Sequence, residues 1–305
     1  MNFEIDDAVT ALLDAVDKLL AHTDASAENM DGRRAYFSAG LDRALEEGGF
    51  LDAATEEDFG PVAAAMLVQR VAATTHIVEA AHSAFLKPLI SADWPRPLAV
   101  ISGDPVRPAR FLAEARTAIL LDADGASILS LEPGDAMPVD SLFAYPMGQL
   151  VDPAACRARA EPLDDSGEVR RAVLLASACE LAGVLQGGLL SVNDYVKNRQ
   201  QFGRPIGSFQ GVQHRLAQAA STITAGLWLS RKAAGDGEMA SALLAAGYVQ
   251  DNAPRIIYDL HQFMGAMGLT LEHPLYRWTY RARLLVADLG GASANLRDAA
   301  DAAWQ

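Results

Sequence analysis

The chain has 305 residues, 50% of them hydrophobic, and carries a formal net charge of −14. This apolar content is enough for one large domain, or two to three small ones, with a buried core, so a disordered chain is excluded. The acidic balance argues against non-specific binding to nucleic acid, because neutralising phosphates requires clustered Lys and Arg side chains.

Cysteine usage and the N-terminal residues indicate the compartment. Cys156 and Cys179 form neither a disulfide framework nor a zinc-type spacing, so we expect two unpaired thiols in a reducing environment. Residues 1–7 are acidic where a secretory signal would be basic and then apolar. We expect no apolar run to approach the roughly 20 residues that a membrane-spanning helix needs. The sequence therefore predicts a cytoplasmic protein without membrane insertion.

Helical periodicity dominates the first part of the chain. Apolar residues recur at intervals of three and four from Ile5 to Leu20, which is typical of an amphipathic helix. A second helix is predicted from about Arg33 to Glu47, where two glycines follow. Pro61 suits a first helical turn, and the Ala-, Val- and Leu-rich residues 62–86 predict one longer helix. We assign residues 1–92 to an N-terminal helical domain.

A small middle β domain is predicted for residues 93–163. Pro95 and Pro97 interrupt the helical pattern at its start. Short apolar runs follow at 98–101, 117–121 and 127–131, and the four residues from Asp122 to Gly125 are a good hairpin signal between the last two.

Helical periodicity returns at residue 164 and continues to 305, which we assign to a C-terminal helical bundle. The chain is therefore predicted to be mainly α with a small central β domain. Four breaks rich in glycine and proline divide the bundle into four to five helices, at residues 203–207, 235–237, 265–274 and 290–291.

Two motifs in the C-terminal region carry a family resemblance. The first, NRQQFGRPIGSFQ at 198–210, contains Arg199, Phe202 and Gln210. The second is QFMGAMGLTLEHP at 262–274. In order and spacing the two motifs closely resemble the Arg-x-x-Phe-Gly and Gln-x-x-Gly-Gly-x-Gly-x-Thr-x-Glu patterns of the acyl-CoA dehydrogenase family.

The resemblance implies a fold and a cofactor. The expected fold is an N-terminal helical domain, a truncated middle β domain and a C-terminal four-helix bundle. Arg199, Phe202, Gln210, Gln262 and Gly265 match family positions that reach across a dimer interface to FAD held mainly by the neighbouring subunit.

These residue types suit the implied role. A guanidinium is a fixed fork of donors for pyrophosphate oxygens, an amide can donate to phosphate or ribose oxygens, and glycine permits close backbone approach. The alternative is that Arg199 offsets a helix dipole, Phe202 is core and the glycines only end helices.

The catalytic base is the main departure from the family. An active member removes the proton α to the thioester with a carboxylate while a hydride passes from Cβ to the flavin. Of the two positions that members use for this base, one matches Gly290 and the other lies close to Val173, so neither carries an acid. The nearest substitutes are Asp288 and Glu168. A shift of two helical residues rotates a side chain by about 200°, which would aim Asp288 away from the substrate.

The middle region departs as well, because between Pro88 and Gly125 there is neither the Gly-Ser turn nor the Trp-x-Thr strand with which full-length members hold their own FAD. A chain that lacks both these FAD-binding segments and the catalytic base resembles the short, degenerate subunits of heteromeric acyl-CoA dehydrogenases. Such subunits belong to bacterial steroid side-chain degradation. The resemblance implies a full-length partner subunit, a shared FAD, an acyl-CoA substrate in a dimer or heterotetramer, and no activity of the chain alone. A bulky steroid-derived acyl group is expected by analogy.

Two alternatives stay open. The chain would be an autonomous FAD-dependent acyl-CoA dehydrogenase with a relocated base such as Asp288, or a flavin-free scaffold or binding protein of the same fold. No metal site is predicted, since no histidine joins carboxylates at a recognised spacing. His76, Glu79 and His82 are predicted on one helix, at angles too far apart for a single ion.

Overall fold

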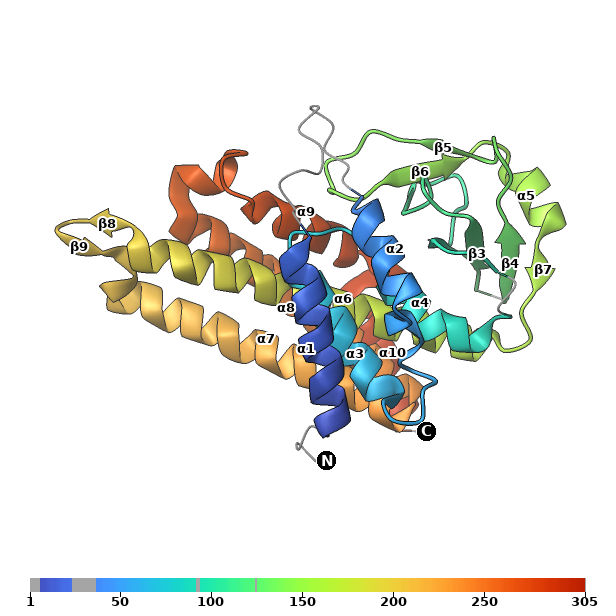
Figure 1. Ribbon diagram of the computed structural model, residues 1–305, viewed down its shortest axis with the longest axis horizontal. Coiled ribbons are helices and arrows are strands. Elements are labelled where there is room, and N and C mark those ends of the chain that lie inside the picture. The colour runs from blue at the N-terminus through green and yellow to red at the C-terminus, as the bar shows by residue number, and fades with distance from the viewer. Residues whose placement is uncertain (1–5, 24–36, 92–93, 124, 305) are drawn as a thin grey trace. The chain divides into compact units, whose positions relative to one another are not determined.

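The computed structural model describes residues 6–23, 37–91, 94–123 and 125–304 (Figure 1). The chain forms two compact units, Met1–Val68 with His76–Ala176 and Gln69–Thr75 with Ser177–Gln305. Mainly helical architecture with small sheets is confirmed. The three-domain division at residues 92 and 163 stays a prediction.

The first two predicted helices are present in the first unit. Helix α1 (Asp7–His22) begins where the Asp6 carboxylate accepts a hydrogen bond from the Ala8 amide at 3.0 Å. Helix α2 (Ala39–Glu47) is followed by Gly48 and by Gly49 in the left-handed region. The predicted starts at Ile5 and Arg33 lie outside the described residues.

The prediction of one helix through residues 62–86 is wrong. Helix α3 (Gly60–Ala72) stops, and α4 (Ala81–Leu86) begins only after eight non-helical residues. The Trp278 indole donates to the carbonyl of Ala73 at 2.9 Å, and Arg281 donates to those of Ala72 and Thr74 at 3.2 and 2.7 Å. Side-chain donors therefore replace the backbone amides that would continue the helix.

The same break corrects the predicted placement of His76 and Glu79 on the helix of His82. Both precede α4, and the Glu79 carboxylate accepts from the Ser83 amide at 3.0 Å in its first turn. Short 3-10 helices flank this region, η1 (Phe50–Asp52) and η2 (Lys87–Leu89).

Two small sheets complete the first unit. One has the order β1-β3-β4-β7, with β1 parallel to β3, and the other has the order β2-β6-β5. The predicted hairpin is confirmed, since β3 and β4 pair antiparallel from Thr117↔Ser130 to Leu121↔Ala126.

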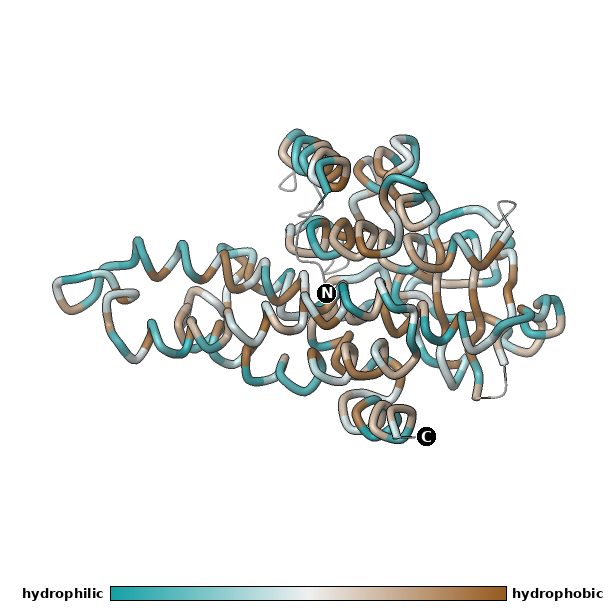
Figure 2. The backbone as a smooth tube through the Cα atoms, turned by 90° about the horizontal axis from the view of Figure 1, so that it is seen from below, coloured by the Kyte–Doolittle hydropathy of each residue, from teal (hydrophilic) through white to brown (hydrophobic). Residues whose placement is uncertain are grey.

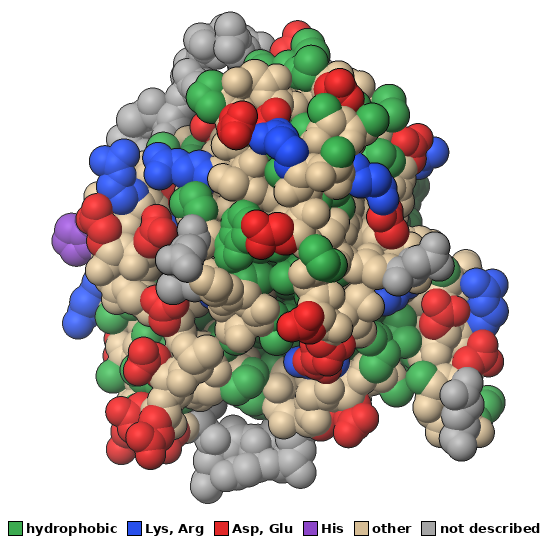
Figure 3. Space-filling view, turned by 90° about the vertical axis from the view of Figure 1, so that its right-hand side faces the viewer, with side chains coloured by type: hydrophobic (Ala, Val, Ile, Leu, Met, Phe, Trp, Pro, Cys, Tyr) green, Lys and Arg blue, Asp and Glu red, His purple; other side chains and the backbone are tan. Residues whose placement is uncertain are grey.

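Acidic side chains are scattered over the face seen in Figure 3. The bounds are β1 (Leu98–Ser102), β2 (Ala109–Arg110), β3 (Thr117–Leu121), β4 (Ala126–Ser130), β5 (Ala136–Pro138), β6 (Met147–Leu150), β7 (Glu161–Pro162) and α5 (Pro153–Arg159).

The second unit is built on long helices that break where the sequence predicts. A core of Leu, Val, Ile and Ala side chains lies between them, and hydrophilic residues prevail at the β8–β9 end of the bundle (Figure 2). The bounds are α6 (Ser166–Asn198, entering from the first unit), β8 (Gln200–Gln201), β9 (Arg204–Pro205), η3 (Ile206–Ser208), α7 (Gln210–Asp236), α8 (Met239–Met264), η4 (Gly265–Leu269), α9 (Leu275–Leu285), η5 (Asp288–Gly290) and α10 (Gly291–Ala303).

Helix α6 corrects the reading that no apolar run reaches membrane-spanning length. Among the residues that the structure describes, it is the helix long and apolar enough to span a bilayer. Its apolar window is 89% buried within the protein, as in the core helix of a soluble protein. Cys179 lies on this helix, and burial raises the pKa of its thiol to about 12. The apolarity of α6 therefore reflects burial in protein.

Candidate cofactor-binding site

Three segments of the second unit meet at one end of the bundle: the end of α6, the start of α7 and the end of α8 (Figure 1). The Tyr195 ring on α6 meets the His273 ring edge-on at 6.1 Å. Arg215 on α7 forms an ion pair with Asp259 on α8 and lies 5.1 Å from the Phe263 ring centre. The structure thus brings the two sequence motifs to one end of the bundle.

The β8–β9 hairpin projects from the end of α6. Gln201 pairs with Arg204, and both residues of the turn have positive φ, 54° at Phe202 and 78° at Gly203. Such a pair is the I′ geometry that suits the twist of two strands. A left-handed conformation costs a residue with a Cβ roughly 1–2 kcal/mol, yet the Phe202 ring is 90% exposed. Phe202 is therefore not a core residue in this chain.

Arg199 lies at the base of this hairpin. Its amide donates to the Tyr195 carbonyl and its carbonyl accepts from the Ile206 amide, both at 2.9 Å. The exposed guanidinium has no hydrogen bond or ion pair with any described residue. Its place directly after α6 also lets the charge offset the helix dipole. The backbone is thus fixed while the donors of the side chain stay available.

The remaining predicted residues lie on the neighbouring helices. Gln210 is the exposed first residue of α7, and Gln262 is exposed in the last turn of α8. Gly265 has a φ of 57° and open space where a side chain would lie. Gly268 differs, because a Cβ there would lie 2.7 Å from the Cβ of Met264. Gly265 therefore leaves backbone accessible, whereas Gly268 serves packing.

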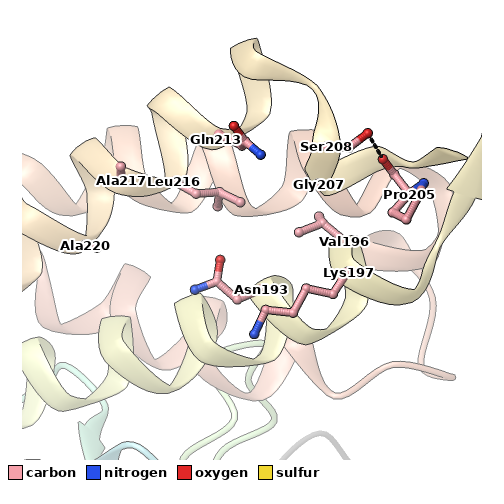
Figure 4. Close-up of a pocket in the computed structure, with 10 residues that line it drawn as sticks. All are labelled: Asn193, Val196, Lys197, Pro205, Gly207, Ser208, Gln213, Leu216, Ala217 and Ala220. Atoms are coloured by element: carbon pink, nitrogen blue, oxygen red, sulfur yellow. Dashed lines mark hydrogen bonds between the residues drawn. The ribbon is translucent and has the colours of Figure 1, made fainter.

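Sequence reasoning missed two grooves in the second unit. One, of about 520 Å³, lies between α6 and α7 behind the hairpin, where Val196 and Leu216 point toward each other (Figure 4). The other, of about 680 Å³, runs along α8 and α9. Leu269 and Leu271 in its wall are 80% and 71% exposed. The sequence signal for these grooves was apolar residues at helical spacing. Because a buried helix face shows the same spacing, this signal does not distinguish a groove from the core.

The two positions expected for a catalytic base carry none. Gly290 has a φ of 90° and stands between Leu289 and Gly291, which also have positive φ. Val173 is 3% exposed in the apolar part of α6. Each residue keeps a local structural reason for its identity, and neither offers a proton acceptor.

The two substitute acids are held by other groups. The Asp288 carboxylate accepts from the Ser177 hydroxyl at 3.2 Å, and the Asp288 carbonyl accepts from the Gln250 amide at 2.9 Å. In the other unit, Glu168 accepts from Arg171 at 2.7 to 3.0 Å. Within the described residues, no group of three His, Cys, Asp or Glu side chains could hold a metal ion.

Solved structures define the fold class. The ChsE4–ChsE5 complex from Mycobacterium tuberculosis superposes with a TM-score of 0.78 at 19% identity, over 99% of this chain and 98% of that one. The Tcur3481–Tcur3483 steroid ACAD G363A variant gives 0.72 at 21%, over 97% and 95%. The fold is that of an acyl-CoA dehydrogenase.

Sequence comparisons match the C-terminal region of the chain to one family. Residues 174–302 match the family described as acyl-CoA dehydrogenase, C-terminal domain. Acyl-CoA dehydrogenase FadE34 of Mycobacterium tuberculosis is 35% identical over 191 residues, 59% of this chain and 26% of that protein. The 3-sulfinopropanoyl-CoA desulfinase of Paraburkholderia xenovorans is 33% identical over 127 residues, 40% and 32% of the two chains. The matched region thus spans about a quarter to a third of these relatives. Residues 174–302 therefore resemble the C-terminal domain of the acyl-CoA dehydrogenase family, and both sequence motifs lie within this matched region.

Proposed function

We propose that this chain is the non-catalytic subunit of a heteromeric acyl-CoA dehydrogenase and that its β8–β9 hairpin and the end of α8 bind FAD held mainly by a full-length partner. The observation that carries the proposal is the hairpin itself. The Arg199 guanidinium has no hydrogen bond or ion pair with the described residues, and Phe202 is both exposed and in an unfavourable backbone conformation. Strained residues of this kind cluster at ligand-binding sites.

The exposed groups at this end of the bundle suit one part of a dinucleotide cofactor. The Arg199 guanidinium matches the geometry of pyrophosphate oxygens, and the exposed amides of Gln210 and Gln262 can donate to phosphate or ribose oxygens. Gly265 lets backbone approach a ligand closely. The partner would hold the rest of the cofactor.

The chemistry divides between the two chains accordingly. A bound FAD would supply the acceptor for the hydride that leaves Cβ of the acyl-CoA. The carboxylate that removes the α proton has to come from the partner, because Gly290 and Val173 supply none and Asp288 is hydrogen-bonded to Ser177. This chain would bind and orient the cofactor without handling the transferred proton.

The structural neighbours support a proposal for the assembly and the substrate. One is a complex of two different chains, and the other is described as a steroid ACAD. We therefore propose a dimer or heterotetramer with a full-length partner, located in the cytoplasm, that acts on a bulky steroid-derived acyl-CoA.

Purification with and without a partner tests the proposal. The chain alone should be colourless, and co-expression with a full-length acyl-CoA dehydrogenase encoded beside it should give a complex with the visible absorption of FAD. Stoichiometric FAD on the lone chain would instead support an autonomous dehydrogenase. If the partner forms a stable complex with this chain but carries the same amount of FAD alone as in the complex, the result would support a flavin-free scaffold.

A further inference from the structure

The turn of the β8–β9 hairpin packs on a single ring, that of Phe209. The Arg204 guanidinium carbon lies 4.0 Å from the Phe209 ring centre, within the range of a cation–π contact. The Phe202 ring meets the same ring edge-on, with centroids 6.1 Å apart and planes at 89°. Phe209 therefore contacts both the strand after the turn and the turn itself.

Phe209 is well placed to act as this support because its backbone is fixed. It immediately precedes α7, and its carbonyl accepts from the amides of Val212 and Gln213 at 3.0 and 3.1 Å. Its amide donates to the Ile206 carbonyl at 3.2 Å. The ring thus stands on the first turn of a helix of 27 residues. A ring anchored in this way can hold a flexible turn in one conformation.

Among the described residues, the stack on Phe209 is the interaction that explains the position of the Arg204 side chain. Its side chain makes no hydrogen bond and no ion pair with any described residue, although acidic side chains are plentiful in the chain. An exposed arginine with no carboxylate partner samples many rotamers, and ordering it costs entropy. The stack on Phe209 is the contact that offsets this cost.

We propose that Arg204 is a positioning residue of the cofactor arm: by stacking on Phe209 it holds the hairpin turn, with Phe202 and Arg199, in the conformation that binds the partner's FAD. This inference rests on the proposed function. Arg204 acts through Phe209 and does not itself contact the cofactor. Fixing the arm before association removes ordering costs that would otherwise weaken binding.

Stacking variants of the reconstituted complex test the inference. The dissociation constant for FAD is measured by flavin absorbance for Arg204→Ala, Phe209→Leu and the double variant. We expect Arg204→Ala to weaken FAD binding about fivefold, in line with the loss of one exposed stacking contact. Phe209→Leu removes the same stack and also the edge contact with Phe202, so its loss should be at least as large. The double variant should then bind FAD as weakly as Phe209→Leu alone, without the product of the two losses. Phe209→Tyr keeps the ring face and should stay within about twofold of the unchanged chain.

Two further readouts separate positioning from other roles. Melting of the lone chain should be unchanged by Arg204→Ala, because a surface contact contributes little to folding. The salt dependence of FAD binding should flatten in Arg199→Ala, which removes a phosphate contact, and persist in Arg204→Ala. Multiplicative losses in the double variant, or a flattened salt dependence in Arg204→Ala, would overturn the positioning role.

The reference variant Arg199→Ala keeps the two failures distinct. If Arg199→Ala leaves FAD binding unchanged, the proposed function itself fails. If Arg199→Ala weakens binding but the Arg204 and Phe209 variants do not, only the positioning role of Arg204 fails.

Discussion

Asp288 accepts a hydrogen bond from the Ser177 hydroxyl at 3.2 Å, and Ser177 is 1% exposed on α6. The carboxylate of Asp288, two residues before the expected base position at Gly290, is therefore held by the interior of the bundle. A general base has to reach the proton that it removes, and a hydrogen bond from a buried hydroxyl favours a fixed, structural carboxylate.

The first prediction concerns Asp288 as a base. Asp288→Asn keeps the shape of the side chain and still accepts from Ser177, so acyl-CoA turnover by the complex should stay within about twofold of the unchanged complex. Turnover is followed by reduction of an electron acceptor. Loss of more than about a hundredfold, without a change in FAD content, would identify Asp288 as the base.

The second prediction concerns restoring the family base at Gly290. Its φ of 90° is unfavourable for any residue with a side chain, and a Cβ would lie 3.0 Å from the Cβ of Ala294. Gly290→Glu should therefore lower the free energy of unfolding by roughly 1–2 kcal/mol and give no turnover in the lone chain. Chemical denaturation and an activity assay check the two parts. An active, equally stable variant would contradict both.

The third prediction contrasts two glycines of the bundle. A Cβ at Gly187 on α6 would clash with the carbonyl oxygen of Ala73 and the indole of Trp278, whereas a Cβ at Gly211 on α7 meets nothing within 4 Å. Gly187→Ala should destabilise the chain by roughly 1–3 kcal/mol, as overpacking does. Gly211→Ala is the matched control and should be neutral or stabilising by up to about 1 kcal/mol. Equal effects in a denaturation experiment would refute the close approach at Gly187.

The fourth prediction concerns a buried charge cluster in the first unit. Arg96 donates to Asp42 at 3.0 Å and lies 3.3 Å from a Glu79 oxygen, with all three side chains nearly inaccessible. Burial raises the pKa of both carboxyls above their ordinary values of 3.8 and 4.5, although Arg96 opposes the shift. Arg96→Met removes the opposing charge and should cost about 3–5 kcal/mol at neutral pH.

The raised pKa values of Asp42 and Glu79 set how the stability of the Arg96→Met variant depends on pH. Carboxyls with a raised pKa in the folded state bind more protons when folded than when unfolded, so stability falls as pH rises above the ordinary values. Arg96→Met should therefore regain stability as pH is lowered from 7 toward 5, measured by urea denaturation across that range. Arg43→Met on the exposed side of α2 is a control and should show no such gain.

Local signals predicted much of the fold. The Asp122–Gly125 turn and the glycines and prolines around 203–207 and 290–291 gave the hairpin and the helix breaks, because turn chemistry lies in the residues themselves. The break after Ala72 was not predictable in this way. It depends on Trp278 and Arg281, which lie some two hundred residues further along the chain.

The sequence predicted which residues belong to the site better than it predicted how they are arranged in space. The motifs identified Arg199, Phe202 and Gln262, and the structure brings their segments to one end of the bundle. The stack of Arg204 on Phe209 and the two grooves depend on the path of the turn and on helix packing. No spacing in the sequence encodes them.

The central claim is that Arg199 serves a cofactor held by another chain. The most direct measurement is the FAD content and FAD affinity of the complex with a full-length partner, comparing Arg199→Ala with Arg297→Ala, an exposed arginine on α10. A hydrogen bond to a charged group contributes about 1.5–3 kcal/mol, so Arg199→Ala should weaken FAD binding roughly 10- to 100-fold while Arg297→Ala leaves it unchanged. Equal FAD affinity in both variants would contradict the account.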